Sequence, residues 1–118
     1  GVLDRHPELR IVLAHGGGAV AALRGRLAHE QTFHPPGRDV RGALRRFFVD
    51  TVVHDADVLR DLVGFFGVER VLLGSDYPFD MGTERPVQIV RALGLPPTDE
   101  AAVLGGNALR LLRQEPAS

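Results

Sequence analysis

The sequence predicts an α/β fold built on three parallel β-strands with helices between them. Three short runs rich in Val, Ile, Leu and Phe lack strict alternation, as expected for strands that are covered on both faces. Segments with helical periodicity separate these runs and give the order β-α-β-α-β-α. Strands that are joined through helices run parallel, with right-handed crossovers. The chain is therefore expected to contain three βα units of a larger α/β structure.

Short, mainly apolar runs mark the three predicted strands. The strands are expected at Arg10–Ala14 (RIVLA), Phe47–Val52 (FFVDTV) and Arg70–Gly74 (RVLLG). Residues Val2–Arg5, ahead of the first strand, are expected to be the end of a helix. Helical segments are expected between the strands and after the last of them.

Apolar residues recur at helical spacing between and after the strands. In the first such segment Val20, Leu23 and Leu27 form one apolar stripe. In a later one, Asp55 is a suitable N-cap and Gly67 a suitable C-terminal stop. The predicted elements are helices at Ala19–Glu30, Val40–Arg46, Asp55–Phe66 and Pro86–Leu93, a further helix that follows Thr98 as N-cap and restarts at Asn107, a loop at Gln31–Asp39 and a frayed tail at Gln114–Ser118.

The composition fits one globular domain and excludes several classes of protein. The chain has 118 residues, of which 44% are apolar and 25% charged, and its net charge is -1. A nucleic-acid binder would show a basic stripe, and a membrane span would need an apolar run of roughly 18 residues; the sequence shows neither. Because cysteine is absent, disulfides and thiolate metal sites are excluded. A cytoplasmic location is expected.

The carboxyl ends of the three predicted strands carry the chemistry-bearing residues. The first strand ends in HGGG (residues 15–18), the second in DTVVHD (residues 50–55) and the third in SDYP (residues 75–78). In parallel α/β folds ligands bind at the carboxyl edge of the sheet. We therefore expect a functional site that includes His15 and Asp76.

Each candidate residue also has a purely structural interpretation. Asp76 could close a turn through nearby backbone amides, or it could be a metal ligand or general base. The glycines after His15 could let a helix start close to the sheet, or His15 could be an acid–base group beside a ligand. The position of His54, just before a capped helix, indicates a structural role. His6, His29 and His34 are expected on the surface. Arg24 and Arg26 are expected on a solvated helix face, although either could bind a substrate carboxylate through two hydrogen bonds.

Two known motifs compete for the glycines. GGGAVA (residues 16–21) fits the dinucleotide fingerprint G-x-G-x-x-A, but that motif needs an acidic residue about 20 residues on, where a proline-bearing loop lies. HGGG also resembles the oxyanion-hole motif of esterases. Those enzymes need G-x-S-x-G, and the sequence around Ser75 lacks both glycines. The dinucleotide-binding alternative is weak, and the esterase alternative fails within this chain.

Four blocks together resemble the amidohydrolase-related family, and in particular its aminocarboxymuconate-semialdehyde decarboxylase-like members. The blocks are GVLDRHPELRIVLAHGGG, FFVDTVVHD, RVLLGSDYPFDMG and LGGNALRLL, in the family's order. The resemblance implies that residues 1–118 are a C-terminal part of a (β/α)₈ barrel, with a divalent metal, usually zinc, in its mouth. It implies non-oxidative decarboxylation or hydrolysis of a small, often aromatic-derived acid.

The resemblance also assigns roles to individual positions. Asp76 matches the metal-binding aspartate of the last barrel strand, and His15 matches the acid–base histidine that activates water beside the metal. Arg26 matches an arginine that helps to bind the substrate carboxylate across a subunit contact. A homo-oligomer is expected, because an incomplete barrel leaves strand edges open to pairing.

The sequence also departs from the family. The H-x-H metal ligands of the family are absent, and a barrel takes about 250 residues. We therefore expect this chain to be a fragment that is inactive alone; the alternative is a non-catalytic remnant or partner half that acts through assembly.

Overall fold

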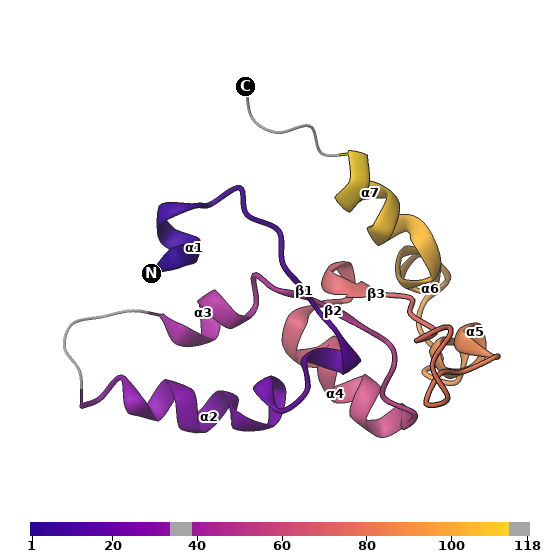
Figure 1. Ribbon diagram of the computed structural model, residues 1–118, viewed down its shortest axis with the longest axis horizontal. Coiled ribbons are helices and arrows are strands. Elements are labelled where there is room, and N and C mark those ends of the chain that lie inside the picture. The colour runs from indigo at the N-terminus through magenta and orange to yellow at the C-terminus, as the bar shows by residue number, and fades with distance from the viewer. Residues whose placement is uncertain (34–38, 114–118) are drawn as a thin grey trace.

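A three-stranded parallel sheet lies at the centre of the molecule (Figure 1). The computed structural model describes residues 1–33 and 39–113. The strand order is β1-β2-β3, and both neighbouring pairs are parallel. The strands are β1 (Val12–Leu13), β2 (Phe48–Asp50) and β3 (Val71–Leu72). The prediction of three parallel strands with helices between them is confirmed.

The regular strands are shorter than the sequence predicts at both ends, because only two or three residues of each strand are paired. The last pairs are Leu13 with Val49 and Asp50 with Leu72. Beyond them the backbone leaves the extended conformation, and His15 and Asp76 have positive φ angles. The residues that the sequence places at the ends of strands therefore lie in loops that rise from the sheet.

The helices lie close to their expected positions. In Figure 1, α2 and α3 lie on one side of the sheet and α5 to α7 on the other. The predicted N-cap at Thr98 is wrong: α6 begins at Pro97, because proline's fixed φ suits a first helical turn. The helical segments are α1 (Val2–Arg5), η1 (His15–Gly17), α2 (Val20–Glu30), α3 (Val40–Leu44), α4 (Ala56–Phe66), η2 (Val68–Arg70), α5 (Pro86–Arg91), α6 (Pro97–Ala101), η3 (Ala102–Gly106) and α7 (Asn107–Arg113).

Helix α4 supplies much of the hydrophobic core. The Asp55 carboxylate caps it by accepting hydrogen bonds from the Asp57 and Val58 amides, and Gly67 ends it at φ 90°. Both boundaries were predicted. Its buried side chains pack against β2 and β3, and each buried leucine or phenylalanine contributes about 1.5–3 kcal/mol. These side chains are Leu59, Leu62, Phe65 and Phe66.

A buried asparagine attaches the last helix to the sheet. The side-chain Nδ2 of Asn107 donates to the carbonyls of Val68 (2.8 Å) and Val71 (2.7 Å). Its Oδ1 accepts a hydrogen bond from Arg110. Asn107 is 1% exposed, so these bonds satisfy polar groups that water cannot reach. The GGNA block is therefore the structural link between β3 and α7.

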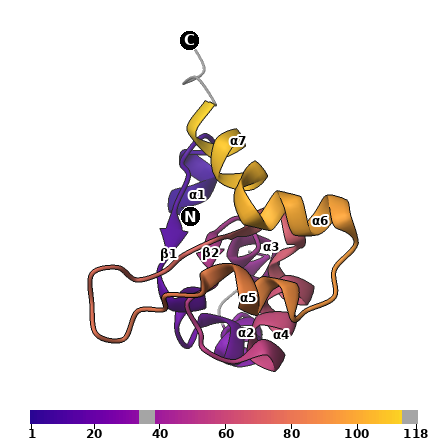
Figure 2. The same ribbon diagram turned by 90° about the vertical axis from the view of Figure 1, so that its right-hand side faces the viewer.

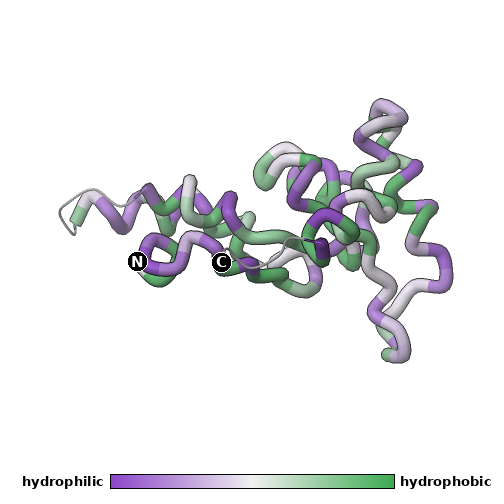
Figure 3. The backbone as a smooth tube through the Cα atoms, turned by 90° about the horizontal axis from the view of Figure 1, so that it is seen from above, coloured by the Kyte–Doolittle hydropathy of each residue, from purple (hydrophilic) through white to green (hydrophobic). Residues whose placement is uncertain are grey.

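The molecule is more open than a closed domain of its size. Its radius of gyration is 15.2 Å, whereas a compact domain of this length is expected near about 13.5 Å. The apolar stripe of α2 is not buried: Leu23 is 45% and Leu27 39% exposed, because no element of the described chain covers that face. Figure 3 shows hydrophobic segments at the periphery as well as in the centre. None of the helices within residues 1–33 and 39–113 has the length and apolar character needed to cross a membrane.

Candidate active site

A pocket of about 540 Å³ lies where the carboxyl ends of the three strands meet. Its polar lining consists of His15, His54 and Asp76, one residue from each strand exit. The long loop between β3 and α5, which carries part of the lining, projects from the body of the molecule (Figure 2). The apolar lining residues are Val52, Val53, Phe79 and Met81. The structure thus brings together the two main candidates from the sequence.

The three polar lining residues share an unusual backbone conformation. His15 (φ 54°), His54 (φ 55°) and Asp76 (φ 59°) are the three non-glycine residues with positive φ in the described part of the chain. Histidine and aspartate adopt this left-handed region more readily than most residues, but it still carries strain. Such strain persists where the surrounding structure holds it, and it concentrates at functional sites. The coincidence of all three at one pocket supports a functional site there.

The backbone amides of the HGGG loop are all used within the protein. The amides of His15 and Gly16 donate to the Asp50 carboxylate, and those of Gly17 and Gly18 donate to carbonyls of the preceding turn. An oxyanion hole or a pyrophosphate cradle needs such amides to be free. The loop therefore supports neither the esterase nor the dinucleotide-binding alternative.

The close approach of this loop to the core predicts a strong effect for Gly16→Ala. A Cβ at Gly16 would lie 2.5 Å from Val53 Cγ1 and 2.6 Å from Leu62 Cδ1, and φ is 61°. The left-handed backbone costs about 1–2 kcal/mol and the forced packing about 1–3 kcal/mol. We expect the free energy of unfolding, measured by urea denaturation of the chain, to fall by about 2–5 kcal/mol.

Gly94→Ala is the matched control for this prediction. Gly94 has φ 64° but no atom within 4 Å of the added Cβ, so only the backbone term applies. The difference between the two variants isolates the packing contribution. Equal losses of stability in both variants would show that the Gly16 contact with Val53 and Leu62 is unimportant.

The side chain of Asp76 is not used to close its own turn. The Tyr77 amide donates to Ser75 Oγ (3.3 Å), and the Phe79 amide donates to the backbone carbonyl of Asp76 (2.9 Å). Among the described residues, no donor bonds to the Asp76 carboxylate, and none bonds to the His15 imidazole. Both side chains thus remain available to a ligand in the pocket.

His54 has the structural contact that the sequence favoured, and it also lines the pocket. One ring nitrogen, Nε2, lies 2.6 Å from the carbonyl oxygen of Met81. A carbonyl only accepts, so Nε2 is the protonated ring nitrogen. This bond joins the exit of β2 to the long loop after β3.

The other candidate residues lie outside the pocket. Arg24 forms a bidentate ion pair with Asp61 (3.0 Å for both bonds), so its guanidinium is not free to clamp a substrate. Arg26 is exposed on α2 and does not line the pocket. His6 and His29 are exposed, as expected, while His34 and the predicted tail lie outside the described residues.

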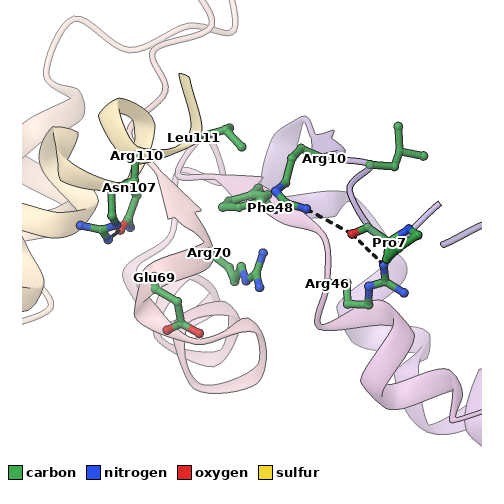
Figure 4. A pocket seen from close by; sticks show the side chains of 10 residues that line it. Pro7, Arg10, Arg46, Phe48, Glu69, Arg70, Asn107, Arg110 and Leu111 are labelled. Atoms are coloured by element: carbon green, nitrogen blue, oxygen red, sulfur yellow. Dashed lines mark hydrogen bonds between the residues drawn. The ribbon is translucent and has the colours of Figure 1, made fainter. Parts of the chain in front are cut away.

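A second pocket, of about 260 Å³, opens at the opposite, amino-terminal ends of the strands (Figure 4). Its lining includes four arginines, but the structure gives them protein contacts. Arg10 and Arg46 both donate to the Pro7 carbonyl, and Arg70 lies 4.7 Å from the centre of the Phe48 ring. Arg110 bonds to Asn107. These contacts support a structural role, and active sites of parallel α/β folds lie at the other edge.

Asp50 and Thr51 were not among the residues predicted to form the site, and they bond to the exits of β1 and β3. Two polar residues at the end of an otherwise apolar strand were the available signal. Their partners at these strand exits are 34 or 35 residues away for Asp50 and 23 for Thr51. Contacts at such separations depend on the folded sheet, so the local pattern did not reveal them.

The pocket fits one corner of a divalent-metal site. Asp76 offers a carboxylate and His15 an imidazole, and divalent metals bind both donor types. Within residues 1–33 and 39–113, no group of three or more His, Cys, Asp or Glu side chains is arranged to hold a metal ion. Catalytic zinc takes three protein ligands. The donors of this pocket therefore fit a divalent ion in kind, but on their own they are too few to complete a catalytic zinc site.

Comparison with known proteins decides the family. The family model described as amidohydrolase matches residues 1–114. The chain belongs to the amidohydrolase family. One amidohydrolase relative, 2-amino-3-carboxymuconate-6-semialdehyde decarboxylase of Dictyostelium discoideum, is 37% identical over 123 residues, which cover 98% of this chain and 34% of that protein. The enzyme of the same name from Caenorhabditis elegans is 31% identical and is 29% covered. The family predicted from the HGGG and GSDYPF blocks is confirmed.

Solved amidohydrolase structures confirm the partial barrel. The 5-carboxyvanillate decarboxylase LigW of Sphingomonas paucimobilis matches with a TM-score of 0.80 and 33% identity, over 96% of this chain and 36% of LigW. A dihydroxybenzoic acid decarboxylase from Polaromonas, solved with bound manganese, matches with a TM-score of 0.81, and its 21% identity supports the fold alone. This amidohydrolase chain thus spans about a third of the length of the relatives that it matches.

Proposed function

We propose that this chain supplies the closing strands of a metal-dependent decarboxylase that acts on a small carboxylic acid with an aromatic or conjugated skeleton. The observation that carries the proposal is the pocket in which His15 and Asp76, both without hydrogen-bond partners for their side chains among the described residues, meet at the carboxyl ends of the strands. The relatives named above are decarboxylases of such acids. Hydrolysis of a related substrate is the second outcome that the same groups allow.

In this proposal His15 moves the proton. Decarboxylation breaks the bond between the carboxylate carbon and the substrate skeleton, carbon dioxide leaves, and the skeleton takes up a proton in its place. The imidazole of His15 lines the pocket, and imidazole is the side chain most often used as a general acid or base, so it is suited to deliver that proton and to regain one from water. The pocket wall of Val52, Val53, Phe79 and Met81 suits an apolar skeleton and limits the access of water.

Asp76 is proposed as a metal ligand, with zinc as the expected ion. A bound divalent ion would supply Lewis acidity to the pocket. Its further ligands would come from the two thirds of the barrel that this chain does not contain. Arg26 is exposed on α2 and does not line the pocket of its own chain. We therefore propose that it binds the carboxylate of a substrate held in the pocket of a neighbouring subunit of a homo-oligomer.

A chimaera tests the proposed function. Residues 1–118 replace the matched stretch of the Dictyostelium decarboxylase, and carbon dioxide release is measured with that enzyme's substrate and with 5-carboxyvanillate. We expect metal-dependent release from the chimaera and none from this chain alone or from the relative with the stretch deleted. A folded chimaera that binds the metal without releasing carbon dioxide from either acid would contradict the proposal and would favour the alternative of a non-catalytic assembly partner.

A further inference from the structure

The carboxyl end of the central strand β2 is bonded to the exit of β1. Asp50 is the last residue of β2, and its carboxylate accepts three backbone hydrogen bonds. Oδ2 accepts from the His15 amide (3.0 Å), and Oδ1 accepts from the amides of Gly16 (2.9 Å) and Val52 (3.0 Å). The Asp50 carboxylate therefore ties the loop that carries His15 to the central strand.

The next residue makes the corresponding connection to the exit of β3. Thr51 is 2% exposed, and its Oγ1 accepts from the Gly74 amide (3.1 Å) and donates to the Gly74 carbonyl (3.5 Å). Gly74 lies two residues before Asp76 and beyond the last ladder pair of β2 and β3. A Cβ at Gly74 would lie 2.8 Å from Val52 Cγ2, so the two backbones are closely packed here.

His15 and Asp76 need such support because the sheet no longer holds them. Both lie beyond the last paired residues, in left-handed backbone that relaxes unless neighbouring groups fix it. Carboxylate-to-amide bonds are charge-assisted and stronger than neutral ones. The paired contacts of Asp50 and Thr51 are thus placed to set the separation of the two pocket residues.

We propose that Asp50 and Thr51 are positioning residues that hold the backbones of His15 and Asp76 in the arrangement needed for decarboxylation. The catalytic part of this inference rests on the proposed function, whereas the contacts do not. Asp50 is not an acid, base or metal ligand in this scheme, because its two oxygens already accept three amides. The dipeptide acts only through the neighbouring strand exits.

Amide hydrogen exchange in the chain tests the contacts without any assay of activity. Asn at position 50 keeps one acceptor oxygen but turns an NH₂ group toward amide donors. In Asp50→Asn we expect the His15 and Gly16 amides to exchange about 10- to 100-fold faster, as for a lost bond to a charged acceptor. The control is Asp39→Ala, which removes the side-chain oxygen that caps α3 by accepting from the Gly42 amide (2.9 Å). It should speed exchange at Gly42 and leave His15 unchanged.

Thr51 provides a second pair of variants if Asp50→Asn does not fold. Thr51→Val keeps the shape but removes both bonds to Gly74, and Thr51→Ser keeps the hydroxyl. We expect the Gly74 amide to exchange at least ~10-fold faster in Thr51→Val and near the parent rate in Thr51→Ser. Unchanged exchange at His15, Gly16 and Gly74 in the folded variants would overturn the inference.

Kinetics of the chimaera then separate positioning from simple stability. We expect Asp50→Asn and Thr51→Val to lower kcat about 10- to 100-fold with KM within about 3-fold, because a misplaced reacting group affects the transition state more than binding. Thr51→Ser should restore kcat. A parent chimaera without activity would overturn the proposed function and leave the exchange result to decide the positioning contacts. Full kcat in variants with faster exchange would overturn the catalytic part.

Discussion

Replacing His15 by Asn is expected to lower kcat of the chimaera about 100- to 10,000-fold, the range for loss of a general acid or base. Asn is chosen because it tolerates the left-handed backbone at φ 54°, so the variant removes the imidazole without added strain. The His15 ring has no hydrogen-bond partner among the described residues, and stability should therefore change little. Initial rates of carbon dioxide release measure the effect, with KM expected to stay within about 3-fold.

The control for this prediction is another histidine of the same chain. His29 is exposed on α2 and contacts Phe33 edge to face, away from the pocket. His29→Asn should leave turnover near that of the parent chimaera. Turnover of His15→Asn within about twofold of the parent would remove His15 from the acid–base role.

Asp76→Asn is expected to abolish stoichiometric metal binding in the chimaera. The substitution keeps the side-chain shape and the tolerance for φ 59° but removes the charge that favours a divalent cation. Loss of residues that merely orient metal ligands costs about 10–100-fold in affinity, so loss of a ligand should cost at least ~100-fold. Metal content by elemental analysis and titration with Mn²⁺ or Zn²⁺ measure this change, and carbon dioxide release should fall to background.

Asp80 provides a matched control in the same loop. It is an exposed carboxylate four residues beyond Asp76 and does not line the pocket. Asp80→Asn should retain full metal content and activity. If Asp76→Asn retained one tightly bound metal ion per chain, Asp76 would not be a metal ligand.

The local sequence was sufficient to locate most elements. Helix α4 illustrates this, because a capping carboxylate at Asp55, an apolar stripe and a stopping glycine at Gly67 are all encoded within one segment. The stripe of α2 shows the limit. Leu23 and Leu27 have the spacing of buried residues, yet no element of the described chain covers them and both are exposed.

The sequence by itself determined the family and the two candidate residues at the pocket, because HGGG and GSDYPF place His15 and Asp76 directly after apolar strands. Only the tertiary structure decided which polar groups are free and which are committed. Asp50 and Asp76 are both aspartates at strand ends. The carboxylate of Asp50 accepts hydrogen bonds from backbone amides of the β1 exit, whereas Asp76 lines the pocket. Hydrogen-bond partners that are distant in sequence meet only when parallel strands align, so pattern alone could not separate these two roles.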